Sequence, residues 1–204
     1  MRFPLAAPPT AATRLLGLAG ILGGAVLLAA FLIEIPPGLN EARLVLFNLG
    51  AIAVVVAVHR RQVAVSRTLH RVVNTAAVGA NAWHLSMVVL SIGGASPFAG
   101  DMGLMSFYAA LAMWLADAAF GVAVLRSGGA SRWGPLALTV GSVLAISGMD
   151  RLGLTSAADP TIFGLLALTG VGLNGLGWIL LGLEIALGGR LTVPDAKLRG
   201  LSRA

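Results

Sequence analysis

Apolar runs long enough to cross a lipid bilayer constrain this chain more than any other feature. About six such runs, each almost free of charge, lie at residues 15–33, 42–58, 72–92, 104–125, 134–149 and 161–187. The hydrocarbon core of a bilayer, about 30 Å thick, is crossed by about 20 apolar residues in a helix. Lipid offers no partner for backbone polar groups, so each run must satisfy its own as a helix. The sequence therefore predicts an all-α bundle of about six transmembrane helices in one integral membrane domain.

The composition excludes a soluble globular protein. Hydrophobic residues make up 57% of the 204 residues and charged residues only 11%, whereas a soluble domain carries about 25% charged residues. The mean hydropathy of +0.91 agrees with a chain that is surrounded by hydrocarbon. The longest stretch outside the apolar runs is a short basic tail at 188–204, which is expected to be cytoplasmic.

The distribution of basic residues predicts the orientation of the helices. If the chain begins on the cytoplasmic side, all 14 lysines and arginines except Arg43 and Arg151 fall on that same side. The positive-inside rule assigns such loops to the cytoplasm, so both ends are expected there, near the anionic lipids of the inner leaflet. The first run is expected to be a retained helix. A cleaved signal peptide is the alternative, although the apolar part of a signal peptide is usually shorter.

The charge and the lack of cysteine exclude several classes of function. The net charge is +6, but no basic segment is long or interleaved with aromatic residues, so nucleic-acid binding is not expected. Without cysteine, thiolate catalysis, disulfides and iron–sulfur ligation are excluded. No catalytic or nucleotide-binding motif stands in a usable context. An enzyme is therefore not favoured, and neither a cofactor nor a metal is expected.

Polar side chains inside the apolar runs are the candidate functional residues. Four of them lie well inside their runs: Asn81, His84, Asp117 and Asn174. Measured from the inner side, helix geometry puts Asn81 about 13 Å, Asp117 about 12 Å and His84 about 18 Å deep. The four residues form one intramembrane polar site if the runs at 72–92, 104–125 and 161–187 are neighbours.

Two interpretations of this cluster stay open. A carboxylate and a histidine at mid-membrane are typical of a proton or cation path. The same groups also serve as hydrogen bonds that hold helices together in lipid. Glu184 lies closer to the inner interface and is expected to pair with Arg190 or with water.

Glycine is abundant, and it predicts close packing of helices. The chain has 27 glycines, among them Gly20 and Gly24 in a G-x-x-x-G pattern and several between Gly164 and Gly182. Small residues of this kind let helix backbones approach closely, within one chain or in a homo- or hetero-oligomer. Local unwinding of the stretch around Asn174, which would expose carbonyl groups to a ligand, is the alternative.

One loop resembles a known group of sequences. Residues 125–136 read Leu-Arg-Ser-Gly-Gly-Ala-Ser-Arg-Trp-Gly-Pro-Leu. This stretch resembles the inner loop of many uncharacterised bacterial multi-pass proteins, in which Arg-Ser/Thr-Gly is followed by Pro-Arg-Trp and an apolar helix. Here Ser131 stands where proline is usual. The resemblance covers a small part of the chain and implies a bacterial inner-membrane protein, without implying an activity.

Three functions are open on the sequence alone. The first is a small accessory, structural or regulatory membrane subunit without catalysis of its own. The second is a transporter or channel for a small ion or solute that uses Asn81, His84, Asp117 and Asn174. The third is a membrane enzyme or haem protein, with one haem between His59 and His70 near the inner surface.

Overall fold

The computed structural model describes residues 9–32, 39–62, 68–92, 100–127, 131–147 and 160–188. These residues form six α-helices and no strand. In chain order the helices are α1 (Ala11–Leu32), α2 (Leu39–Gln62), α3 (Thr68–Ile92), α4 (Gly100–Ser127), α5 (Trp133–Ser147) and α6 (Pro160–Ala186). Each helix coincides with a predicted apolar run to within a few residues, and the predicted all-α bundle is confirmed.

Five of the six helices are long and apolar enough to cross a membrane, and α5 is the exception. The 15 residues of α5 rise by about 22 Å, whereas the hydrocarbon core is about 30 Å thick. The sequence predicted a full span at 134–149. Helix α5 coincides with that span as far as Ser147, and residues 148 and 149 lie outside the described ranges.

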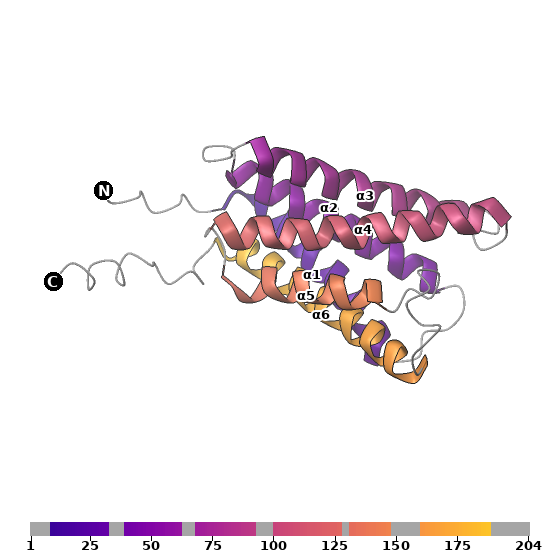
Figure 1. Ribbon diagram of the computed structural model, residues 1–204. Helices are drawn as coiled ribbons and strands as arrows, with labels where there is room; N and C mark the ends of the chain where they lie inside the picture. Colours follow the sequence, from indigo (N-terminus) through magenta and orange to yellow (C-terminus); the bar gives the residue numbers. More distant parts are fainter. Residues whose placement is uncertain are drawn as a thin grey trace.

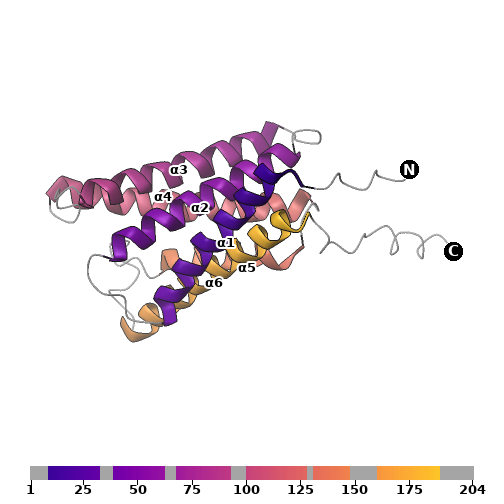
Figure 2. The same ribbon diagram turned by 180° about the vertical axis from the view of Figure 1, so that it is seen from behind.

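The helices form a closed ring in which each packs against the next and α1 packs against α6 (Figures 1 and 2). Neighbouring helices are antiparallel, as paired contacts show: His59 meets Asn74 and Asn48 meets His84 across α2 and α3. The ring places Pro9 against Gly188. The described parts of the chain therefore begin and end at the same end of the bundle, here called the inner end.

Glycines set the distance between α1, α5 and α6. A Cβ atom added at Gly17 would lie 2.6 Å from the carbonyl oxygen of Gly182, and one added at Gly177 would lie 2.6 Å from the amide nitrogen of Leu138. Such backbone-to-backbone approach is possible only without side chains. Gly24 likewise lies against Gly175. The glycine faces considered for oligomer contacts are therefore used within the chain, and α6 runs through this region as one continuous helix without local unwinding.

Aromatic side chains fill the interior of the ring. Phe47 of α2 lies against Trp114 of α4, with ring centroids 6.3 Å apart. Phe120 of α4 stacks on Trp178 of α6 at 5.7 Å. Side chains of α4 thus reach both α2 and α6 across the bundle, and this brings the polar residues of α4 and α6 together.

Candidate functional site

Helix α3 carries polar side chains on its inward face and apolar ones on its outward face. The polar residues follow each other at steps of three and four or multiples of them, which puts them on one side of the helix: His70, Asn74, Asn81, His84 and Ser91. Val72, Trp83 and Leu90 lie on the opposite side of the helix and are exposed. A water-soluble helix shows the opposite pattern, so the arrangement fits a helix whose outward face meets lipid.

Asp117 of α4 is fully buried inside the bundle, among side chains of α3 and α6. The amide nitrogen Nδ2 of Asn81 donates to its Oδ1 over 3.0 Å and also to the carbonyl oxygen of Ala77. On α6, Nδ2 of Asn174 donates to Oγ of Ser142 over 2.9 Å. We call Asn81, Asp117, Ser142, Asn174 and Trp178 the polar centre; all five are 0% exposed.

The polar centre leaves several polar atoms without a hydrogen bond. The Asn174 amide and the Trp178 indole both approach the Asp117 carboxyl group, but neither contact reaches hydrogen-bond geometry. Four buried atoms therefore have no partner among the described residues: Oδ2 of Asp117, Oδ1 of Asn81, Oδ1 of Asn174 and Nε1 of Trp178. Buried polar atoms are nearly always paired, so a group of four around one carboxyl marks this place as unusual.

The members of the centre lie at similar heights along the bundle. Measured along the helices from the inner end, Asp117 lies about 15 Å deep, Ser142 about 14 Å and Asn174 about 18 Å. Asn81 lies about 20 Å along the longer α3. These depths are near the middle of a core about 30 Å thick, where a polar group is most costly.

His84 was predicted to belong to this cluster, but the structure places it elsewhere. Its Nδ1 lies 3.2 Å from Oδ1 of Asn48 on α2. Asn48 uses its Nδ2 on the carbonyl oxygen of Leu44, so its Oδ1 accepts and Nδ1 of His84 carries the hydrogen. His84 and Asn81 are three residues apart and point about 60° away from each other. One therefore faces α2 and the other α4.

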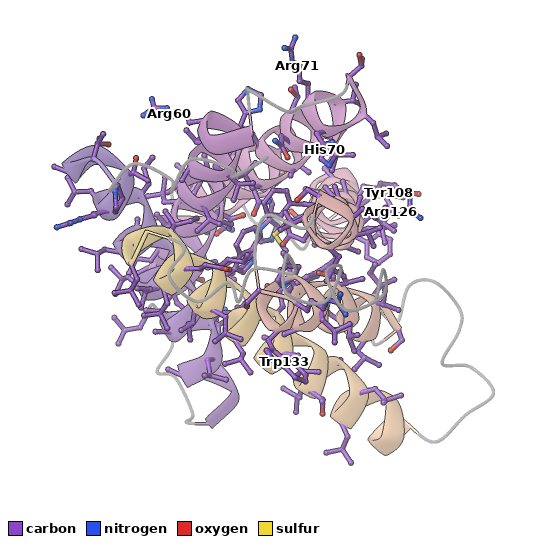
Figure 3. All side chains as sticks on the ribbon, turned by 90° about the vertical axis from the view of Figure 1, so that its left-hand side faces the viewer. Arg60, His70, Arg71, Tyr108, Arg126 and Trp133 are labelled. Carbon is purple, nitrogen blue, oxygen red and sulfur yellow. The ribbon has the colours of Figure 1, made fainter. Side chains whose placement is uncertain are left out.

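Three further polar residues, His59, His70 and Asn74, form hydrogen bonds near the inner end. Nδ2 of Asn74 donates to Nδ1 of His59 over 3.2 Å, whereas Nε2 of His70 donates to the carbonyl oxygen of Ala123 on α4 over 3.2 Å. The two histidines considered for a haem thus engage different helices. Figure 3 shows this end, with His70 between α3 and α4, and Arg60 and Arg71 at the rim.

Glu184 is buried near the inner end of α6, where its Oε1 accepts from the backbone N–H of Ser131 over 2.6 Å. Its expected partner Arg190 lies outside the described residues. Ser131 precedes α5, so the carboxylate stands beside the positive end of that helix. Across the described ranges, no group of three or more His, Cys, Asp or Glu residues could hold a metal ion.

Comparison with protein-family models, curated proteins and solved structures found no match to this chain. The site must therefore be interpreted from its own chemistry. Of the four predicted residues, the structure brings Asn81, Asp117 and Asn174 together and leaves His84 apart. Ser142 and Trp178 complete the centre. Both are polar groups inside apolar runs, but a serine and a tryptophan are common there, so the sequence offers no signal that singles them out.

Proposed function

We propose that the protein moves a small cation across the membrane, and that Asp117 binds this cation on the way. One observation carries the proposal: a carboxyl group at mid-membrane is fully buried, and one of its oxygens has no partner. Ionisable residues inside membrane helices are costly and usually mark ion pathways. Oδ1 of Asp117 joins α4 to α3 through Asn81, and the unpaired Oδ2 is left to bind a cation.

The unpaired atoms favour ion binding over a purely structural role. Polar residues that only hold helices together satisfy one another, because an unpaired polar group in hydrocarbon costs free energy. Asn48 and His84 behave in this way, since each finds a partner. The polar centre does not, because four of its atoms remain without a hydrogen bond. An ion or a proton is the kind of ligand that would complete it.

Helix α3 supplies polar groups between the inner end and the polar centre. His70 and Asn74 lie within about 9 Å of the start of the helix, and Asn81 follows at about 20 Å. The buried Ala77 interrupts this series. Every member of the centre is 0% exposed, so under this proposal a cation bound there would be closed off from both sides of the membrane. Transport then requires rearrangement of the helices around a fixed site, as in alternating access.

Ion flux into proteoliposomes tests the proposal. Wild-type protein should carry H⁺, Na⁺ or K⁺ down an imposed gradient, and Asp117→Asn should reduce that flux at least tenfold. Ser86→Ala is the matched control, because this exposed hydroxyl bonds only within α3 and its loss should leave flux unchanged. Wild-type protein that is folded and correctly inserted but carries none of these ions would contradict the proposal.

An accessory membrane subunit is the second candidate, and the outward face of α3 favours it. This face is mainly apolar, with Val72, Trp83 and Leu90 exposed, and Gly79 has open space where a Cβ would lie. A partner helix could pack closely there. Absence of flux from folded protein would support this function instead.

We also propose that the protein lies in a bacterial plasma membrane with both ends in the cytoplasm, where its basic residues face anionic lipids. The charge asymmetry of the sequence supports this orientation. Reporter tags at the two termini should both report the cytoplasm. Tags on opposite faces would exclude the arrangement.

A further inference from the structure

We propose that the cation at Asp117 is a proton, which binds Oδ2 of the carboxyl group, and that the site does not hold a metal ion. This inference names the substrate of the function proposed above. The claim that the proton is transported rests on that function, whereas the claim that Asp117 binds a proton does not. The protonation itself is a property of the polar centre, and it can be measured without any flux.

The side chains around Asp117 present N–H groups to it. Asn81 donates its Nδ2–H at 3.0 Å, and the amide of Asn174 and the indole of Trp178 approach the same carboxyl. Hard metal cations are bound by oxygen atoms, from carboxylates, carbonyl groups and water. Hydrogen-bond donors repel a metal ion but stabilise a carboxylate. The groups that approach the Asp117 carboxyl are thus donors and match an anion that exchanges a proton, whereas the two amide oxygens of the centre, Oδ1 of Asn81 and Oδ1 of Asn174, form no hydrogen bond with the described residues.

Trp178 makes this assignment specific. An indole nitrogen is a donor only and cannot turn into an acceptor, whereas an amide can exchange its oxygen and nitrogen by rotating. The Trp178 ring stacks on Phe120 at 5.7 Å with an interplanar angle of 17° and is 0% exposed. The ring is held by packing, so its N–H stays beside the carboxyl group. A metal ion bound to this carboxyl group would have to lie close to that N–H.

The orientation of Asn174 is also constrained. The single hydrogen of the Ser142 hydroxyl is donated to the carbonyl oxygen of Leu138 over 2.8 Å. Oγ of Ser142 therefore accepts, and Asn174 must turn its Nδ2 toward it. If Asn174 turned its oxygen to the side where its Nδ2 now lies, so that the oxygen could bind a metal ion, both the Asn174–Ser142 and the Ser142–Leu138 hydrogen bonds would break. Ser142 thus acts as a positioning residue for the amide.

Both protonation states of Asp117 have a physical basis. When Oδ2 takes a proton from a hydronium ion, one O–H bond of that ion breaks to leave water, a new O–H bond forms on the carboxyl, and the group becomes neutral, which suits complete burial in hydrocarbon. When the carboxylic acid gives the proton back to a water molecule, its O–H bond breaks, hydronium forms, and the neighbouring N–H groups stabilise the anion. The groups found against Asp117 are Asn81 on α3 and Asn174 and Trp178 on α6, with Ser142 of α5 behind Asn174. None of them is charged or titratable.

Infrared difference spectroscopy of the purified full-length protein in lipid nanodiscs tests this proposal. Wild type should show a carboxylic acid C=O band that disappears reversibly as pH rises, and Asp117→Asn should lack it. Trp178→Phe removes one donor but keeps a ring to stack on Phe120. Because this N–H approaches the carboxyl group without completing a hydrogen bond, its loss should destabilise the carboxylate only moderately and move the midpoint upward by less than about one pH unit. Trp83→Phe, on the outward face of α3, should leave the midpoint unchanged.

Three results would overturn the proton assignment. The first is a band whose midpoint shifts when Na⁺ or K⁺ replaces choline at constant pH. The second is no Asp117-dependent band within the pH range where the protein stays folded. The third is an equal response to Trp178→Phe and Trp83→Phe. A titrating Asp117 in a protein that shows no flux would retain the proton site and reject only the transport function.

Discussion

Replacing Gly177 by alanine tests whether backbone contact between α5 and α6 holds the bundle together. The new Cβ would lie 2.6 Å from the amide nitrogen of Leu138 and 2.9 Å from its Cα. Backbone atoms cannot swing away as a flexible side chain can, so the two helices must separate by several tenths of an ångström. The polar centre would be disturbed as well, because the hydrogen bond from Asn174 to Ser142 spans this same interface.

The magnitude follows from two opposing effects. Overpacking of a close contact costs about 1–3 kcal/mol, and a rigid backbone contact belongs at the upper end of that range. Alanine in place of glycine in a helix returns about 1 kcal/mol. Gly177→Ala is therefore expected to lower the free energy of unfolding by about 2 kcal/mol.

Gly79→Ala is the matched control, because a Cβ at Gly79 would have no atom within 4 Å. Only the helix-propensity gain of about 1 kcal/mol applies there. The two variants should thus differ by about 3 kcal/mol, which corresponds to about 6–12 °C in Tm for a chain of this size. Thermal unfolding in one detergent, followed by circular dichroism, measures the difference. Equal Tm values would refute the backbone-contact reasoning.

Two further predictions concern hydrogen bonds outside the polar centre. Glu184→Leu leaves the backbone N–H of Ser131 without the Glu184 acceptor and should lower the free energy of unfolding by about 1.5–3 kcal/mol. Glu184→Gln keeps an oxygen acceptor and should lower it by about half as much. Chemical denaturation of both variants measures these losses, and equal losses would contradict the assigned hydrogen bond. Asn48→Leu removes the partner of His84 and should lower the free energy of unfolding by about 1 kcal/mol. Unlike Asn81→Leu, it should leave the infrared titration of Asp117 unchanged. Equal shifts of that titration in the two variants would place His84 within the polar centre.

The polar centre could be predicted only in part, and His84 shows why. The depth of a residue in a membrane helix follows from its position in the sequence, since each residue adds about 1.5 Å. This reasoning brought Asn81 and Asp117 to similar depths, and they are in fact bonded. The rotation of a helix about its own axis does not follow from depth. His84 faces Asn48 of α2 because α3 is rotated to present Asn81 to α4.

The glycines illustrate the same limit. Their number predicted close helix packing, which the contact between Gly17 and Gly182 bears out. Whether such a face packs within the chain or against a second copy depends on which helices are neighbours. That choice is made by the ring, in which α1 returns to α6. No local pattern in the sequence specifies this closure.

The fold class and the approximate helix bounds were determined by the sequence alone. The physical reason is that hydrocarbon forces each apolar run to satisfy its own backbone as a helix, which is a local requirement. The ring closure, the rotation of α3 and the unpaired atoms around Asp117 were decided only by tertiary structure. They depend on contacts between side chains far apart in the chain, such as Phe120 on Trp178, and these contacts position the candidate ion-binding group.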